Sequence, residues 1–214
     1  MKGTHMTLKS IFLSCAFVIG MSIPTAMADT FIYHDTVHNF TFSYPDSWRL
    51  NTVTGTDRVR IAPLHGQDGA ECKMSVVRDG RLTLYPEKYL EDAVPLTLDD
   101  SFWANEVLPN LENVTVHKYF PAAGLGQGYA TSVQVSWGAA TGNSDSKPAY
   151  RANMLASIYG ENRYMFTCQA EVSKFYDWLP VFASITSSVR YAARYAAFPT
   201  GYYRDFLADK PLVK

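Results

Sequence analysis

A group of imidazole and carboxylate side chains near the start of the chain has the residue types for metal chemistry. His34 and Asp35 are adjacent, and His38 follows three residues after Asp35. Neutral imidazole nitrogens and carboxylate oxygens are ligands for zinc or copper, so these residues form a weak candidate metal site. A third strong ligand, from His65 or His117, could approach only through the fold. The alternative is that the three are polar turn residues, and we expect no cofactor.

Other residue patterns give little support for an enzyme. The sequence contains no Gly-x-Ser-x-Gly elbow of the kind that many hydrolases use. Residues 124–128 read Gly-Leu-Gly-Gln-Gly and resemble part of a dinucleotide fingerprint, but that motif must open a helix, and a strand pattern follows here. These glycines therefore favour a hairpin turn. We expect a non-enzymatic protein, with a hydrolase or a metal-dependent enzyme as the alternative.

The first 28 residues have the three parts of a secretory signal peptide. Lysines flank the start, residues 11–23 form an apolar run, and Ala26-Met27-Ala28 offers small residues for cleavage before Asp29. The apolar run is shorter than the about 20 residues that span a bilayer, so we expect no permanent membrane anchor. Lipidation of Cys15 is the less favoured alternative. The expected mature protein is periplasmic.

The composition of the expected mature chain limits its partners. Cleavage would leave 186 of the 214 residues, which suits one domain. It would also remove Lys2 and Lys9, leaving 17 basic against 20 acidic residues and a net charge of −3. Basic residues are scattered among acidic ones, whereas nucleic-acid binding needs a basic stripe. We therefore expect no nucleic-acid partner.

Cys72 and Cys168 are the cysteines that remain after residue 28. An even pair in an oxidising compartment is more often a structural disulfide than a reactive site. A nucleophilic role would need a neighbouring histidine, which the linear sequence does not identify. The sequence therefore predicts a Cys72–Cys168 disulfide that brings an early strand close to a late one.

Periodicity predicts the elements that must position these residues. Alternating patterns indicate strands at 31–34, 40–44, 58–62, 73–77, 114–120, 129–137, 150–159 and 163–170, the last two joined as a hairpin by Gly160-Glu161-Asn162. Spacing of three to four indicates two short helices within 86–108 and a long one from residue 173 to 189. This order of elements predicts an α+β fold, an antiparallel sheet covered by helices.

Aromatic and arginine side chains are concentrated at the C-terminal end of the chain. Such residues are enriched at protein interfaces because they bury a large area and keep a polar handle. Their spacing predicts that the last helix continues through residue 198. The candidate interaction residues are Tyr191, Tyr195, Phe198, Tyr202, Tyr203 and Phe206. The alternative is that this tail packs on the chain's own sheet.

Residues 40–48, Phe-Thr-Phe-Ser-Tyr-Pro-Asp-Ser-Trp, resemble the opening motif of PsbP-like domains, and the apolar segment 182–189 fits their closing helix. This group includes the PsbP subunit of photosystem II, the Mog-type Ran-binding proteins and bacterial periplasmic proteins. The resemblance covers roughly residues 31–190. It implies an α/β/α sandwich and a role in binding or assembly, and it carries over no metal ligands. The motif itself also has a simple folding role, because its alternating aromatics face a core.

These observations divide the chain into a signal peptide at 1–28, a PsbP-like domain at 29–190 and an aromatic extension at 191–214. The expected function is that of an exported periplasmic binding or assembly module, without enzymatic activity. Its expected partner is an envelope protein or a small ligand.

Overall fold

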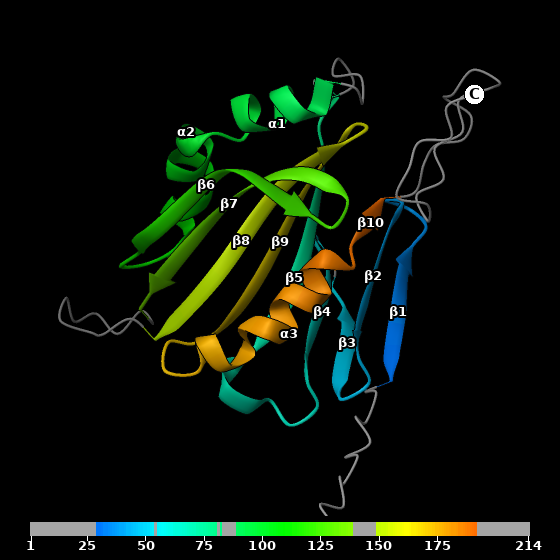
Figure 1. The fold of residues 1–214 in the computed structure, drawn as a ribbon, viewed down its shortest axis with the longest axis vertical. Helices are drawn as coiled ribbons and strands as arrows, with labels where there is room; N and C mark the ends of the chain where they lie inside the picture. The colour runs from blue at the N-terminus through cyan, green and yellow to red at the C-terminus, as the bar shows by residue number, and fades with distance from the viewer. Residues whose placement is uncertain (1–28, 54, 81, 83–88, 139–148, 192–214) are drawn as a thin grey trace, which may run out of the picture.

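The computed structural model describes residues 29–53, 55–80, 82, 89–138 and 149–191 (Figure 1). The strands are β1 (Thr30–Asp35), β2 (Phe40–Pro45), β3 (Trp48–Thr52), β4 (Asp57–Pro63), β5 (Glu71–Arg78), β6 (Thr115–Leu125), β7 (Gly128–Trp137), β8 (Tyr150–Tyr159), β9 (Asn162–Glu171) and β10 (Arg190–Tyr191). The helical segments are η1 (Gln67–Gly69), α1 (Leu90–Thr97), α2 (Asp100–Phe102), η4 (Trp103–Val107), η5 (Leu108–Asn110) and α3 (Phe175–Ser187). Across these ranges, no helix is long and apolar enough to cross a membrane. The expected signal peptide lies outside them.

Seven strands form one antiparallel sheet in the order β3-β4-β5-β9-β8-β7-β6. The hairpin predicted around residues 160–162 joins β8 to β9, with Tyr159 opposite Asn162 across a two-residue turn. The glycine-rich segment 124–128 forms the β6–β7 turn, as predicted, with Leu125 opposite Gly128. These two hairpins build the half of the sheet on which the candidate site lies.

A smaller antiparallel sheet consists of β1, β2 and β10. The predicted helix through residue 198 is wrong at residues 190–191, because α3 ends at Ser187 and the chain then forms strand β10. The main-chain N–H of Ser43 in β2 donates to Oγ of Ser188 at 2.8 Å, and Tyr191 then pairs opposite Phe40. Pairing with β2 therefore replaces further helical turns.

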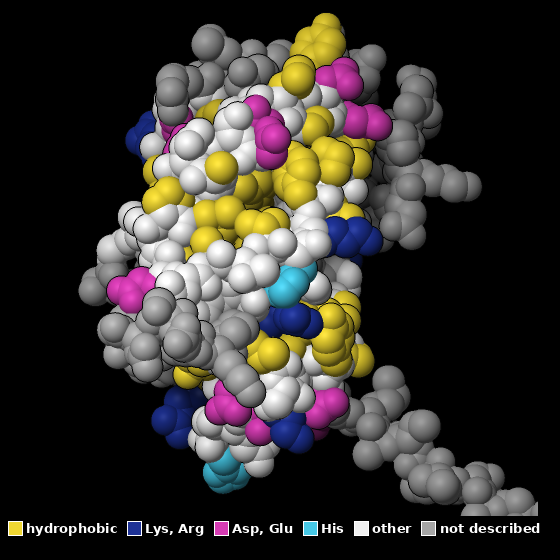
Figure 2. Space-filling model, turned by 90° about the vertical axis from the view of Figure 1, so that its left-hand side faces the viewer, with side chains coloured by type: hydrophobic (Ala, Val, Ile, Leu, Met, Phe, Trp, Pro, Cys, Tyr) yellow, Lys and Arg dark blue, Asp and Glu magenta, His cyan; other side chains and the backbone are white. Residues whose placement is uncertain are grey.

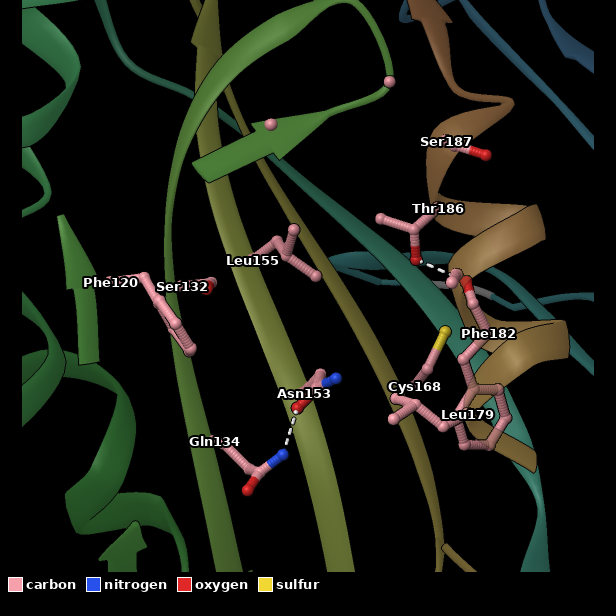
Figure 3. Close-up of a pocket in the computed structure, with 13 residues that line it drawn as sticks. Phe120, Ser132, Gln134, Asn153, Leu155, Cys168, Leu179, Phe182, Thr186 and Ser187 are labelled. Carbon is pink, nitrogen blue, oxygen red and sulfur yellow. Dashed lines mark hydrogen bonds between the residues drawn. The ribbon is translucent and has the colours of Figure 1, made fainter. Parts of the chain in front are cut away.

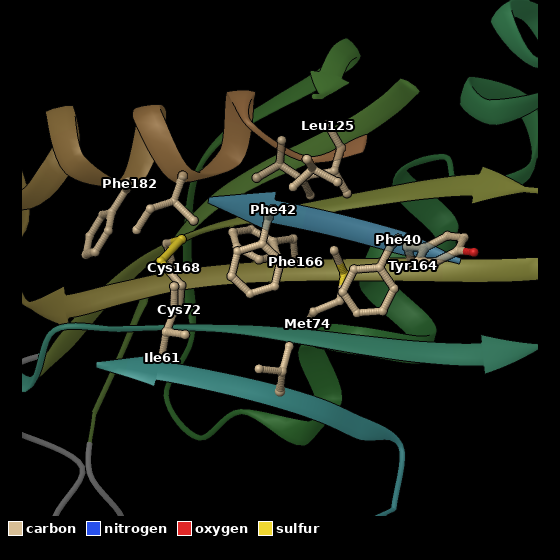
Figure 4. Close-up of a cluster of buried hydrophobic side chains, with 14 of the residues drawn as sticks. Phe40, Phe42, Ile61, Cys72, Met74, Leu125, Tyr164, Phe166, Cys168 and Phe182 are labelled. Atoms are coloured by element: carbon tan, nitrogen blue, oxygen red, sulfur yellow. A yellow bond between two sulfur atoms is a disulfide. The ribbon is translucent and has the colours of Figure 1, made fainter. Parts of the chain in front are cut away.

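The larger hydrophobic core lies between the seven-stranded sheet and a layer made of α3 and the smaller sheet (Figure 4). Phe40 and Phe42 point into it from β2. They contact Tyr164 and Phe166 of β9 edge-on, with ring centroids 6.0 and 5.9 Å apart. Trp48 of β3 is buried in the same core. The aromatic motif at 40–48 thus has the folding role that its alternation predicts.

The other face of the seven-stranded sheet is covered by α1, α2 and η4. Trp103 is buried there, and its indole N–H donates to Oγ1 of Thr131 in β7 at 3.0 Å. The Thr131 hydroxyl donates in turn to the main-chain carbonyl of Leu98 at 2.7 Å. Helices therefore lie on both faces of the sheet, and the predicted α+β fold with an antiparallel sheet covered by helices is confirmed.

The predicted disulfide between Cys72 and Cys168 is present. The two residues are directly opposite each other in the β5–β9 ladder, with their Cα atoms 4.1 Å apart. Both are buried in the larger core. The link therefore joins neighbouring strands that are 96 residues apart in sequence.

Gly126, in the β6–β7 turn, allows two distant parts of the chain to touch. Its φ of +61° lies in the left-handed region that favours glycine. A Cβ atom at this position would overlap with the main-chain carbonyl of Val189, at the junction of α3 and β10. Gly160, in the β8–β9 turn, has a similar φ of +59°, but no atom of the described residues lies within 4 Å of the position that a Cβ would occupy. Comparing substitutions at the two glycines therefore separates the cost of the left-handed backbone conformation from the cost of the close contact.

We expect Gly126→Ala to lower the free energy of unfolding by about 2–3 kcal/mol, because it combines a left-handed conformation with overlap against fixed backbone. The matched variant Gly160→Ala has only the conformational cost and should lose about 1 kcal/mol. Urea unfolding followed by tryptophan fluorescence measures both. Equal losses would contradict the close approach of Gly126 and Val189.

Candidate functional site

A cleft of about 470 Å³ lies between α3 and the face of the seven-stranded sheet formed by β6, β7 and β8 (Figure 3). We call it the α3 cleft. Its size falls in the range of roughly 300–1,000 Å³ that is usual for small-molecule sites. It is lined by Phe120, Gly124, Gly126, Ser132, Gln134, Asn153, Leu155, Cys168, Leu179, Phe182, Ala183, Thr186 and Ser187.

The floor of the α3 cleft follows from strand alternation. Gln134 of β7 is opposite Asn153 of β8, and Ser132 is opposite Leu155. Their neighbours Val133, Val135, Ala152 and Met154 face the core under α1 and α2 instead. Nε2 of Gln134 donates to Oδ1 of Asn153 at 3.1 Å. The remaining amide oxygen and amide nitrogen of this pair have no hydrogen bond to the described residues and can bind a polar group of a ligand.

The wall of the α3 cleft is one face of α3. Its lining residues recur every three to four positions, singly or as adjacent pairs, which places them on one side of a helix: Leu179, Phe182, Ala183, Thr186 and Ser187. The hydroxyl groups of the last two donate to carbonyls of α3 itself, at 2.7 and 2.9 Å. The wall therefore presents mainly carbon to the cleft, and Cys168 adds a disulfide sulfur that is not free to react.

A polar cluster continues the cleft floor beyond Gln134 and Asn153. Ser136 is two residues from Gln134 on β7, and Arg151 is two residues from Asn153 on β8. Both are on the same face as the cleft floor, and they are opposite each other. One guanidinium nitrogen of Arg151 donates to the hydroxyl of Tyr176 on α3 at 2.7 Å, and another lies 3.3 Å from Nε2 of His117. The same His117 nitrogen is 2.8 Å from Oγ of Ser136. Figure 2 shows a histidine and a basic side chain among apolar side chains on the side of the molecule where β6 lies.

The electrostatics of this cluster favour a neutral histidine beside a charged arginine. Burial, and then the neighbouring charge of Arg151, lower the pKa of His117 below its ordinary value. Neutral His117 accepts a hydrogen bond from Arg151 at Nε2. The positive charge at this end of the cleft therefore belongs to Arg151.

The residues His34, Asp35 and His38 do not meet at one point, although Asp35 and His38 are in contact. His34 and Asp35 point to opposite faces of β1, so the first is exposed and the second is buried. Asp35 accepts hydrogen bonds from the main-chain N–H groups of Val37 and His38 at 2.9 and 2.8 Å, and Nδ1 of His38 lies 3.2 Å away. Among the residues described, no three His, Cys, Asp or Glu side chains are placed to hold a metal ion. This geometry fits the alternative interpretation, in which these are polar residues of a turn.

The pKa of Asp35 reflects this turn. Burial alone would raise it, but the hydrogen bonds and charge of His38, together with the N–H of Val37, outweigh burial and hold the pKa below its ordinary value. The carboxylate is therefore an ionised acceptor that closes the β1–β2 connection.

Tyr191 lies in the core and not on a free surface. Its ring stacks on Tyr159 with centroids 5.1 Å apart and meets Tyr164 edge-on at 4.8 Å. Burial raises the pKa of its hydroxyl well above the ordinary value. For this residue the structure agrees with the alternative in which the tail packs on its own domain. The other five interaction candidates lie outside the described residues.

The antiparallel sheet, its helices on both faces and the cleft under α3 define an α+β protein with a PsbP-like fold. The structure is similar to that of the cyanobacterial PsbP protein CyanoP from Synechocystis sp. PCC 6803, with a TM-score of 0.54, 13% sequence identity, and coverage of 83% of this chain and 97% of that chain. The fold expected from the resemblance is confirmed.

Two further solved structures show weaker similarity. LpqN of Mycobacterium tuberculosis, a protein involved in cell envelope biogenesis, has a TM-score of 0.46, 12% identity, and coverage of 79% of this chain and 88% of that chain. The Ran-binding protein Mog1p of Saccharomyces cerevisiae has a TM-score of 0.44, 8% identity, and coverage of 77% and 96%. No protein-family model matches the sequence, and no curated protein matches it either.

The α3 cleft is not predicted by the sequence motifs. A signal was nevertheless present, because Ser132, Gln134 and Ser136 alternate with buried β7 residues. Polar residues at every second strand position normally indicate a face in water. Here α3 crosses that face and turns part of it into a cleft, which only the tertiary arrangement reveals.

Proposed function

We propose that the chain is an exported periplasmic binding module, without enzymatic activity, that takes a small apolar or amphipathic ligand into the α3 cleft. The observation that carries this proposal is the lining: carbon surface from Phe120, Leu155, Leu179 and Phe182, with one hydrogen-bonding amide pair on the floor. This combination of apolar walls and a few placed polar groups is typical of ligand sites. The buried disulfide supports export, because disulfides persist in oxidising compartments.

A hydrolase is the weaker candidate, although His117 and Ser136 are within hydrogen-bonding distance, as a base and a nucleophile would be. Ser136 is 1% exposed, so its hydroxyl is poorly placed to reach a substrate carbonyl. The lowered pKa of His117 also makes it a weaker base. Both features favour binding over catalysis at this cluster.

The aromatic tail is a second proposed contact, for an envelope protein. It would use Tyr195, Phe198, Tyr202, Tyr203 and Phe206, the residues that follow the buried Tyr191. Tyrosine and phenylalanine at this density suit a protein interface. Loss of a periplasmic partner when residues 192–214 are removed, with the cleft still binding ligand, would separate the two contacts.

We expect the mature protein to bind the neutral apolar fluorophore N-phenyl-1-naphthylamine in the α3 cleft. Ala183 and Ser184 are adjacent and exposed on α3, but only Ala183 lines the cleft. Ala183→Trp should therefore fill the cleft and weaken binding at least tenfold, whereas the matched Ser184→Trp should leave it unchanged. Fluorescence titration measures both. Equal binding by the two variants would show that the probe binds elsewhere and would contradict the proposed site.

A further inference from the structure

The charge of Arg151 distinguishes one end of the α3 cleft. Arg151 is not among the residues that line the cleft, but Arg151, Asn153 and Leu155 occupy alternate positions of β8 and share one face of the sheet, so Arg151 is the next residue on that face beyond the lining residue Asn153. On the opposite wall, Tyr176 lies one helical turn before Leu179. The hydrogen bond between Arg151 and Tyr176 therefore joins floor and wall at this end.

Within the described part of the chain, the guanidinium of Arg151 has no carboxylate partner. It contacts the hydroxyl of Tyr176, the neutral ring of His117 and the face of the Tyr176 ring, at 5.3 Å from the ring centroid. Its Nε atom is buried and has no hydrogen-bond partner among the residues that the structure describes. By contrast, Arg163 on β9 has its charge balanced by Glu106 at 2.9 Å. Arg151 thus keeps an uncompensated positive charge and an unused donor.

We propose that the ligand of the α3 cleft is an amphipathic anion with a single aliphatic chain. The chain would lie along Leu155, Leu179 and Phe182, and a carboxylate or phosphate head would bind Arg151. The four steps along the strand from Arg151 to Leu155 cover about 13 Å, which suits a medium-length acyl chain. Anionic heads are preferred partners of arginine because several N–H groups can donate to them at once. This inference rests on the proposed function, since it names the ligand class of the same cleft.

The test uses the mature chain, residues 29–214, and displacement of N-phenyl-1-naphthylamine by three ligands with the same ten-carbon chain: decanoate, decyl phosphate and 1-decanol. At least one anion should displace the probe at a concentration about tenfold or more below that of the alcohol, because a hydrogen bond to a charged group is worth more than one to a neutral group. The better of the two anions identifies the head as a carboxylate or a phosphate.

Arg151→Gln should remove the advantage of the anions, so that decanoate and decyl phosphate displace the probe no better than 1-decanol does. Retained binding of the neutral probe itself shows that the variant is folded. Arg151→Lys, which keeps the charge, should retain part of the advantage. Arg163→Gln makes the same change in net charge away from the cleft and should behave as wild type.

The possible negative results distinguish an error in the proposed function from an error in the proposed ligand class. If the probe and all three ligands fail to bind, the proposed function is wrong. If they bind with equal affinity, or if Arg151→Gln keeps the preference, the cleft remains a ligand site and the inference of an anionic head is overturned. Binding of decanoate only after residues 192–214 are removed would show that the chain's own tail occupies the cleft, which also overturns the inference.

Discussion

Reduction of the Cys72–Cys168 disulfide should lower the free energy of unfolding by about 4–5 kcal/mol, because the link closes a loop of 96 residues in the unfolded chain. Both half-cystines are buried in the core, so reduction also leaves two thiols in a space packed for one disulfide. For a domain of this size the loss corresponds to a fall in melting temperature of roughly 10 °C.

Thermal unfolding with and without a membrane-permeant phosphine reductant measures this effect. The control is Cys72→Ala/Cys168→Ala, which should melt near the reduced wild type and should not respond to the reductant. Two alkylatable thiols in unreduced native protein, or equal melting temperatures with and without reductant, would contradict the prediction. Because Cys168 also lines the α3 cleft, probe binding by the double variant shows whether the cleft depends on the link.

Most of the fold could be predicted from local patterns. The disulfide, the β8–β9 hairpin and the aromatic row of β2 each depend on residue spacing that is visible in the sequence. Strand β3 was missed, because Pro45-Asp46-Ser47 indicated the end of a strand and gave no sign that Trp48 begins another. The chain turns tightly there, and β3 joins a different sheet from β2. A break between two strands and a change of sheet have the same local sequence pattern.

The candidate site could not be predicted for a related reason. Its polar residues come from β6, β7, β8 and α3, and each has an ordinary local explanation as the solvent side of a strand or helix. Arg151 and Tyr176 are 25 residues apart and meet only when α3 crosses the sheet. By contrast, His34, Asp35 and His38 are close in sequence, but only Asp35 and His38 are in contact, since His34 faces the opposite side of β1. Proximity in sequence alone therefore does not show which polar side chains meet.

The C-terminal strand was missed because aromatic spacing of three to four residues is ambiguous. Tyr191 fits a helical stripe with Tyr195 and Phe198, but its ring is also the size that fills the space between Tyr159 and Tyr164. Burial of that ring and pairing of β10 with β2 make a strand more stable than a further half-turn of helix at these residues. Tertiary contacts decided the structure here, as they do for many short segments.

Two truncations that differ by only two residues should therefore differ greatly in stability. A chain ending at Tyr191 keeps β10, whereas a chain ending at Val189 loses it. We expect the shorter chain to be less stable than the longer one by about 3–5 kcal/mol, the usual cost of removing a large buried aromatic side chain. The lost contacts are two aromatic pairs and the β2–β10 ladder. Urea unfolding of both truncated proteins measures the difference.

Point variants of the full chain distinguish the ring from the strand. Tyr191→Ala should reproduce most of the loss, because it removes the ring and keeps the backbone that pairs with Phe40. Tyr191→Phe should cost much less, since it keeps the packing against Tyr159 and Tyr164. If the chains ending at Tyr191 and Val189 unfold at the same urea concentration, β10 contributes nothing and the domain ends with α3. If instead only the chain ending at Val189 is destabilised, Tyr191 is the last residue that the core requires, and the residues after it are free to serve an interface.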